Sequence, residues 1–583
     1  MQLATLDWAL IISFFVVFLI IGILVSKRSG KNTKEFFLSG QNMPWWLLGI
    51  SMVATTFSAD TPNLVTDIVR QNGISGNWVW WAFLLTGMLT VFVYAKLWRR
   101  SKVLTDLEFY ELRYSGKEAA FLRGFRALYL GVFFNVMIMA SVCLAAIKIG
   151  GILFDLEPWQ SVVYASIITV AYSSIGGLRG VIFTDFLQFI VAMIGSVWAA
   201  YYIITMPEIG GLENLLQNEN VSDKLNFLPD FSNSKSLITL LIIPIAVQWW
   251  SVWYPGAEPG GGGYIAQRML SAKDEKNAIG ATLLFNIAHY ALRPWPWILI
   301  ALASLVLYPQ LTDIAEQFPK ATMGHDLGYS AMLTHLPAGL LGLVVASLIA
   351  AFMSTISTHL NWGSSYVALD FYKRFVKPEA SEKELVSVGR LSTVVLMILA
   401  ALLALQFESA LDTFNILLQI GAGTGLIFIL RWFWWRVNAY SEITGMVVSF
   451  VIALIFEFTE LGLEDHEKLV LGVLITTIAW IVATLITQPT DTKHLTKFYK
   501  AITPYGSGWN GFKEKAKQEG EELPTSNDRF TIDLASMLLG VVLVYTALFG
   551  MGYLIYGNLT GALILLAIAG LSGWFIFKLW KQK

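Results

Sequence analysis

The chain has 583 residues, of which 56% are hydrophobic and only 14% are charged, and its mean hydropathy is +0.60. A water-soluble fold cannot hide so much apolar surface, so the composition predicts an all-helical protein that crosses the membrane many times. The formal net charge of −1 gives no reason to expect nucleic acid as a partner. The single cysteine, Cys143, excludes an intramolecular disulfide, and the histidines show no metal-ligand spacing.

Apolar stretches of about 17 residues or more are candidates for membrane-spanning helices. Short amphipathic stretches at 105–114 and 325–335 are expected to lie at the membrane interface instead. The length criterion predicts fifteen spanning segments, at 6–26, 44–69, 77–98, 121–148, 158–176, 181–206, 236–265, 277–308, 337–371, 388–407, 410–435, 442–460, 467–488, 531–556 and 559–579.

The distribution of positive charge predicts the orientation of these segments. With the N-terminus outside and the chain alternating, the loops predicted to lie inside hold 33 of the 40 Lys and Arg residues. Cytoplasmic loops carry such an excess, so we expect the C-terminus inside and the protein in the inner (plasma) membrane. The longest extramembrane stretch, 489–530, is polar and lysine-rich, and is predicted to be a solvated cytoplasmic linker.

Residues 49–62 interrupt the second apolar segment with serines, threonines, Asp60 and Pro62. Proline removes a backbone donor and clashes with the preceding turn, so carbonyl groups nearby are expected to lose their helical partners. Bare carbonyl groups at bilayer depth are tolerated where they line a cavity or bind something. The stretch therefore predicts either a binding site or a simple proline kink.

Residues 244–264, in the seventh segment, contain three further prolines and five glycines, and cannot form a continuous helix. This second interruption comes five segments after the first, and an odd offset gives the two copies opposite orientations. Paired interrupted helices in inverted halves are typical of secondary transporters, with substrate and ion bound at the interruptions. The repeats would comprise segments 2–6 and 7–11.

The ninth segment carries a row of hydroxyl groups. At helical spacing, Ala351, Ser354, Thr355 and Thr358 share one face. Neutral oxygen atoms suit a hard monovalent cation that is held weakly enough to be released. Such hydroxyls also commonly bond back to the preceding turn or pack between helices, and the row alone does not decide between the two interpretations.

Several ionisable residues fall inside apolar segments. Asp185 lies about two turns into the sixth segment, where a buried acid indicates a functional site unless it pairs with Arg179. Arg293 lies near the middle of the eighth segment and needs a carboxylate partner, for which Asp60 and Glu258 are the candidates. Five tryptophans near the interruptions suit either a stacking wall for a ring-shaped solute or an interfacial belt: Trp249, Trp250, Trp253, Trp295 and Trp297.

Taken together, short motifs over residues 1–440 give the chain a resemblance to the sodium:solute symporter family. The motifs are Met-Pro-Trp-Trp at 43–46, Ser58-Ala59-Asp60, Tyr-Ser-x-x-Gly-Gly-Leu at 172–178, Thr184-Asp185, Gln267-Arg268 and Asp370-Phe-Tyr. The resemblance implies a five-plus-five inverted-repeat (LeuT-type) fold preceded by one helix, which agrees with the repeat inferred from the interruptions.

The resemblance also implies sites for the coupling ion. The sodium site would use carbonyl groups and hydroxyls of Ala54, Phe57, Ala351, Ser354 and Thr355. A second sodium, which some members hold, would use Asp185, Ser354, Ser357 and Thr358.

On the solute side the chain departs from the sugar-transporting members. Trp80 stands where they carry a glutamate, Gly261 where they carry an asparagine, and Asn135 where the sialic-acid type carries an arginine. Tyr264 matches the aromatic inner gate. The residues predicted to bind the solute are Thr56, Asp60, Thr61, Glu258, Gly261, Tyr264 and Arg293.

These features predict a sodium-driven importer of a small organic solute, with a sugar or other polyhydroxylated compound preferred over a carboxylate gripped by Arg293. Two other classes are disfavoured. A membrane sensor would be expected to carry a signalling domain, and an enzyme a nucleophile–base pair or cofactor motif. The predicted organisation is a leading helix and loop (1–43), two inverted repeats (44–206 and 207–440), additional helices (441–488), the linker (489–530) and a C-terminal helix pair (531–583).

Overall fold

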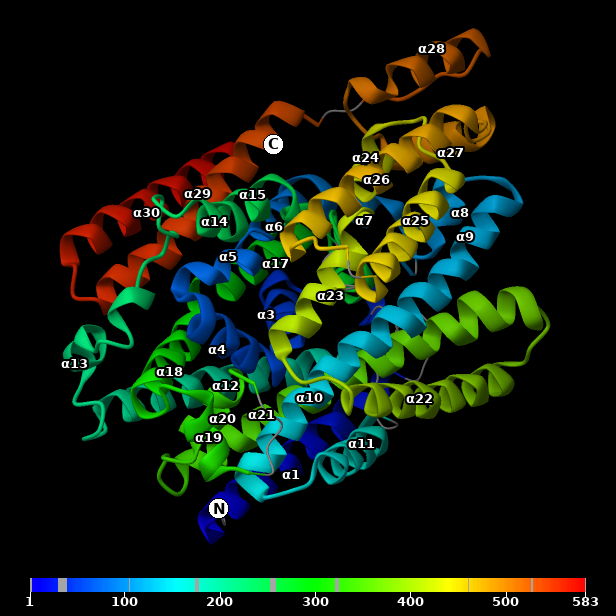
Figure 1. The fold of residues 1–583 in the computed structure, drawn as a ribbon. Helices are drawn as coiled ribbons and strands as arrows, with labels where there is room; N and C mark the ends of the chain where they lie inside the picture. Colours follow the sequence, from blue (N-terminus) through cyan, green and yellow to red (C-terminus); the bar gives the residue numbers. More distant parts are fainter. Residues whose placement is uncertain are drawn as a thin grey trace.

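The computed structural model of the chain is a bundle of packed helices (Figure 1). It describes residues 3–29, 39–103, 105–173, 178–251, 258–319, 324–459, 461–525 and 528–581. Within these ranges there is no sheet, and only an isolated bridge joins Met43 to Ala272. The predicted all-helical class is therefore confirmed.

The main helices follow the chain in an order that matches the predicted segments. Those before the second interruption are α1 (Thr5–Ser29), α3 (Trp45–Thr56), α4 (Asp60–Asn72), α5 (Trp78–Trp81), α6 (Leu84–Leu89), α7 (Ala95–Ser101), α8 (Glu108–Arg113), α9 (Gly116–Leu128), α10 (Asn135–Phe154), α11 (Pro158–Ser173), α12 (Leu178–Thr205), α13 (Leu212–Gln217), α14 (Ser234–Leu237) and α15 (Ile243–Ala246).

Those after it are α16 (Gly263–Ser271), α17 (Glu275–Ile287), α18 (Pro294–Leu307), α19 (Leu311–Gln317), α20 (Leu327–Leu333), α21 (Leu340–Ser365), α22 (Glu382–Ala404), α23 (Ala410–Ala422), α24 (Gly425–Phe433), α25 (Ala439–Phe458), α26 (Asp465–Ile486), α27 (Thr492–Ile502), α28 (Asn510–Gln518), α29 (Phe530–Ile555) and α30 (Leu559–Lys581).

Ten helical stretches in the described residues are long and apolar enough to cross a membrane. The other five predicted segments fall on α1, α11 and three interrupted pairs: α3–α4, α15–α16 and α23–α24. The last interruption, between Ala422 and Gly425, was not expected from the sequence. Fifteen crossings and an outer N-terminus remain predictions.

The first interruption lies within the stretch 49–62 that the sequence indicated. Helix α3 ends at Thr56 and α4 begins at Asp60, so the break comprises residues 57–59. Pro62 falls in the first turn of α4, where a backbone N–H would have no helical partner in any case. The proline therefore marks the start of the second half-helix, and it does not kink a continuous one.

The second interruption contains glycines whose backbone conformation is not helical. Helix α15 ends at Ala246 and α16 begins at Gly263, with residues 252–257, including Trp253, outside the described part. Gly260, Gly261 and Gly263 all have positive φ angles of 50–89°, which side chains with a Cβ rarely adopt. At Gly260 a Cβ would also lie 3.1 Å from the Tyr94 ring. The predicted break is confirmed.

The broken helices lie at the centre of the bundle. Helix α3 packs against α12, α16, α17 and α21, whereas α4 packs against α10, α18, α20 and α23. Helices α29 and α30 pack chiefly against each other and form one flank of the molecule (Figure 1). The two half-helices of the first break therefore face different sets of neighbours, which places any site at the break between those sets.

Residues 489–530 differ from the solvated linker expected. They contain α27 and α28; α27 packs against α7 and α8, and its Phe498 ring contacts Trp432 of α24. Trp509 is fully buried, stacks on Phe498 and donates from its indole N–H to the Trp432 carbonyl at 2.9 Å. The lysines that dominate the composition lie on the outer face. Because the stretch as a whole is polar, its overall composition does not show that one face of each helix is apolar.

Replacing Trp509 with alanine should destabilise the packing of α27 and α28 by about 3–5 kcal/mol, because the change leaves a large cavity beside the Phe498 ring. The measurement is the melting temperature of purified protein, together with the rate of proteolysis within 489–530. Lys517→Ala, at an exposed position on α28, is the matched control and should change neither quantity. Equal behaviour of the two variants would contradict the packing described.

Candidate transport site

The end of α3 meets the hydroxyl row of α21, as predicted. Thr355 donates from its hydroxyl to the Thr55 carbonyl at 3.4 Å, and both residues are buried. Ala54 and Phe57 are also buried, and the Phe57 N–H donates to the Ala54 carbonyl at 3.1 Å. The structure thus brings the end of α3 against a hydroxyl of α21, and the carbonyl that accepts from it is that of Thr55, which the sequence did not indicate.

Asp185, on α12, lies in the same region and is fully buried. Its carboxylate accepts hydrogen bonds from Ser51 and Ser354, both at 2.8 Å, and from Thr55 at 3.3 Å. Its ion-pair partner is Arg268 on α16, with a nitrogen–oxygen distance of 3.5 Å. The sequence indicated a buried acid at Asp185, with pairing to Arg179 as the alternative to a functional role, and the side chain of Arg179 lies outside the described part.

The other two residues predicted for a second sodium lie one turn further along α21. The Ser357 hydroxyl donates back to the Ser354 carbonyl at 3.0 Å, as hydroxyls in membrane helices commonly do. The Thr358 hydroxyl is buried and has no hydrogen-bond partner among the residues that the structure describes. Thr358 therefore presents an oxygen atom that is available to a ligand.

Two small cavities adjoin the first break and share Thr56 and His289 in their walls. The larger, of about 70 Å³, is lined by Asp60, Thr61 and Arg293 among others. The smaller, of about 50 Å³, is lined by Glu258, Gly261 and Tyr264. Both are far below the roughly 300 Å³ of typical small-molecule sites, so the structure is closed around this region.

A wider groove of about 490 Å³ lies beyond the larger cavity on the same helices, α4 and α23. Its lining includes the amide side chains of Asn72, Gln248 and Asn415. Neighbouring positions on α23 line the two spaces: Leu411 and Leu418 line the groove, whereas Phe414 and Leu417 line the cavity. The groove and the cavity therefore lie against neighbouring faces of α23.

Arg293 follows a wide π-helical turn over Ala288–Leu292, in which the Arg293 N–H bonds to the Ala288 carbonyl five residues earlier. Such turns are frequent at functional sites because they redirect side chains. The guanidinium group donates to the Thr56 carbonyl at 2.9 Å and lies 5.2 Å from the centre of the Trp297 ring. Asp60 lines the same cavity.

His289 was missed in the sequence. It contacts the Thr56 hydroxyl at 3.2 Å and a guanidinium nitrogen of Arg293 at 3.4 Å. The i, i+4 spacing of His289 and Arg293 was the available signal, since both fall on one helix face.

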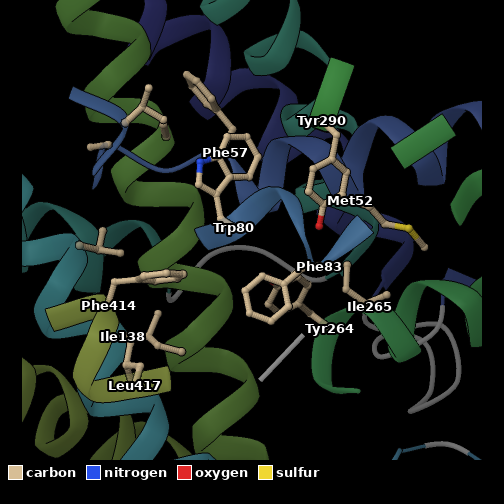
Figure 2. Close-up of a cluster of buried hydrophobic side chains, with 14 of the residues drawn as sticks. Met52, Phe57, Trp80, Phe83, Ile138, Tyr264, Ile265, Tyr290, Phe414 and Leu417 are labelled. Carbon is tan, nitrogen blue, oxygen red and sulfur yellow. The ribbon is translucent and has the colours of Figure 1, made fainter. Parts of the chain in front are cut away.

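Aromatic rings form the remaining walls. Trp80 stacks on Tyr290 with ring centres 5.7 Å apart, and Phe57 stacks on Trp297 at 5.4 Å. Figure 2 shows Phe57, Trp80 and Tyr290 in one cluster, with Phe414 on its other side. Trp295 instead packs towards α29, where its indole N–H donates to the Leu548 carbonyl at 3.2 Å. Of the five tryptophans predicted for a stacking wall, Trp297 stacks on Phe57, whereas Trp80, which was not among the five, lines the larger cavity.

Glu258 lines the smaller cavity, but its carboxylate is paired with Arg126 on α9 and with Arg431 on α24, the latter at 3.7 Å. Glu442 on α25 completes the group, at 3.6 Å from Arg431. All four side chains are 2% exposed or less. The expected alternative of a Glu258–Arg293 pair is therefore wrong, and Asp60 is the acid that shares a cavity with Arg293.

Broken helices that meet around polar groups in the middle of an all-helical membrane bundle define the class of secondary transporters. A model of the sodium:solute symporter family matches residues 36–449, and the chain belongs to that family. It is 25% identical to the sodium/glucose cotransporter of Vibrio parahaemolyticus over 501 residues, covering 81% of this chain and 88% of that one.

Two further comparisons agree with that assignment. The chain is 26% identical to sodium/myo-inositol cotransporter 2 of Oryctolagus cuniculus, covering 79% of this chain and 71% of that one. Its fold is similar to the solved structure of a Na⁺-coupled sialic acid symporter in a substrate-bound outward-open state, with a TM-score of 0.65 and 23% identity. That similarity covers 84% of this chain and 99% of the other.

Replacing Glu258 with glutamine should lower stability by about 3–5 kcal/mol, because it leaves two buried guanidinium groups with one carboxylate fewer. Thermal unfolding of purified protein measures the effect. Glu521→Gln, which removes a partly exposed pair with Lys500, is the matched control and should cost less than about 1 kcal/mol. A smaller loss for Glu258→Gln than for the control would contradict the buried pairing.

Proposed function

We propose that this symporter imports a neutral, polyhydroxylated solute such as a sugar, together with sodium, by alternating access. The observation that carries the choice of solute is that Asp60 and Arg293 line one cavity. Their opposite charges leave that cavity without net charge, and together they supply acceptors and donors for hydroxyl groups. The relatives named for glucose and myo-inositol support the same class.

The solute would lie against Thr56, Asp60 and Thr61 on one side and against the rings of Trp80 and Phe414 on the other. Flat apolar rings suit the less polar faces of a ring-shaped solute, whereas the polar groups fix its orientation. On the side of the smaller cavity, the path would be closed by Glu258, Gly261 and Tyr264, with Glu258 held in place by its ion pairs with arginines. The cavity would widen when α4 and α23 move apart towards the groove.

Sodium would bind between α3 and α21, using oxygen atoms of Ala54, Phe57 and Ala351 with the hydroxyls of Ser354 and Thr355. A second ion would use Asp185, Ser354, Ser357 and Thr358. Entry of each ion into the negatively charged cytoplasm releases about 2.3 kcal/mol per 100 mV, which drives accumulation of the solute. We place the protein in the plasma (inner) membrane, where such a gradient exists.

Replacing Ser354 and Thr355 together with alanine should abolish sodium-stimulated uptake, because two of the proposed sodium ligands are lost. The measurement is uptake of a panel of radiolabelled sugars into proteoliposomes under a sodium gradient, with a potassium gradient as reference. Ser392→Ala, on the neighbouring helix α22, removes a hydroxyl that donates back to the Val388 carbonyl of its own helix and is the matched control. Undiminished sodium-dependent uptake by the double variant would refute the site.

A carboxylate is the second candidate solute, and the observation that favours it is the guanidinium group of Arg293 at the cavity. Arg293→Lys distinguishes the two, since lysine keeps the charge but loses the planar fork that binds a carboxylate through two bonds. We expect transport of a neutral sugar to fall less than tenfold in this variant. A loss of a hundredfold or more that is confined to carboxylate solutes would favour the second candidate.

A further inference from the structure

The pairing of Asp185 with Arg268 has a bearing on ion coupling that the sequence did not reveal. Both side chains are fully buried. Arg268 donates to the Ser51 hydroxyl at 3.1 Å and to the Thr55 hydroxyl at 2.8 Å, and these two hydroxyls also donate to Asp185. The guanidinium and carboxylate groups therefore share one shell of hydroxyls on α3.

The same arginine is anchored to the second broken helix. It lies on α16, donates to the Tyr264 carbonyl at 3.2 Å and stands 5.5 Å from the centre of the Tyr264 ring. Tyr264 in turn lines the smaller cavity. Through Arg268, the carboxylate on α12 holds together α3 and α16, the two helices next to the two breaks.

A sodium ion at the second site would need the same carboxylate. Ser354 already donates to Asp185 at 2.8 Å, and the buried Thr358 hydroxyl, which lacks a partner among the described residues, lies one turn away on α21. Two cations next to one carboxylate repel strongly where no water screens them. Arg268 and sodium are therefore expected to exclude each other from Asp185.

We infer that Arg268 is a tethered cation that competes with sodium for Asp185, and that their exchange links occupancy of the second ion site to the position of α16. Arg268 is thus a positioning residue. With Arg268 on Asp185, α16 is bound to α12 by an ion pair and the carboxylate is neutralised without an ion. With sodium on Asp185, the guanidinium loses its counter-charge and α16 loses its ion pair with α12. The inference rests on the proposed function, because it assumes a sodium ion at the second site.

If Arg268 competes with sodium, removing Arg268 should strengthen sodium binding. Arg268→Gln removes the competitor, so purified full-length protein should reach half-saturation at a sodium concentration about tenfold lower than the wild type, which corresponds to about 1.4 kcal/mol. A merely structural role for Arg268 would instead weaken sodium binding. The probe is sodium chloride, titrated against the melting temperature and the tryptophan fluorescence, with choline chloride holding the ionic strength constant.

Three variants make the test specific. Adding Asp185→Asn to Arg268→Gln should abolish the gain, because the gain depends on the released carboxylate. Arg268→Lys keeps a charge but loses the planar fork to Ser51 and Thr55, so it should shift the titration about two- to threefold in the same direction. Arg70→Gln, at another buried arginine that donates to Ser304 and Tyr308, is the matched control and should leave the titration unchanged.

The outcomes separate this inference from the proposed function. A wild-type protein that responds equally to sodium and choline overturns the sodium site and the inference together. A wild-type protein that responds to sodium, with Arg268→Gln equal to it or weaker, overturns the inference alone. If Arg268→Gln does not fold, Arg268→Lys decides: a tighter titration supports the competition, and an unchanged or weaker one overturns it.

Discussion

The carbonyl groups at the end of α3 are the constraint on which the rest of the structure depends. A helix that stops in the middle of a membrane bundle leaves backbone acceptors where no bulk water can satisfy them. Each of the last few is met from a different direction. The Ala54 carbonyl accepts from the Phe57 amide, the Thr55 carbonyl from Thr355 on α21, and the Thr56 carbonyl from Arg293 beside α18.

This arrangement places the proposed ion and solute sites next to successive residues at the end of α3. Thr55 faces the hydroxyl row and Asp185, whereas Thr56 faces Arg293 and His289. A rigid-body shift of α3 that alters one set of contacts alters the other, because Thr55 and Thr56 are consecutive in its last turn. Coupling between ion and solute then needs no long pathway through the protein.

Buried charged side chains also link helices to one another elsewhere in the bundle. Glu258 joins the second break to α9 and α24, Asp185 joins α12 to α16, and Lys148 joins α10 to Asp326 just before α20. A buried ion pair adds little net stability, but breaking it by removing one partner is costly. Pairs that cross between helices therefore favour a few discrete arrangements over a continuous range, as a transporter that alternates between states requires.

The sequence by itself determined the helical class, both expected breaks and the polar residues that stand out at bilayer depth. Each of these follows from local chemistry: apolar length, Pro and Gly in a helix, and the cost of burying Asp185 or Arg293. It also identified Asp60 as a possible neighbour of Arg293, but left Glu258 as an equal alternative. The packed face of α27 was missed because exposed lysines dominate its composition, and the third break, at residues 423–424, was missed although Gly421, Gly423 and Gly425 mark it.

Only the tertiary structure decided which charges meet. Arg268 lies 83 positions after Asp185 in the chain, and Arg431 lies 173 positions after Glu258, so no periodicity relates the members of either pair. Their contacts depend on how α3, α12, α16 and α24 cross in space. A buried charged residue can be recognised in a sequence because the residues around it are apolar. Its partner cannot, because the partner depends on how helices that are distant along the chain pack together.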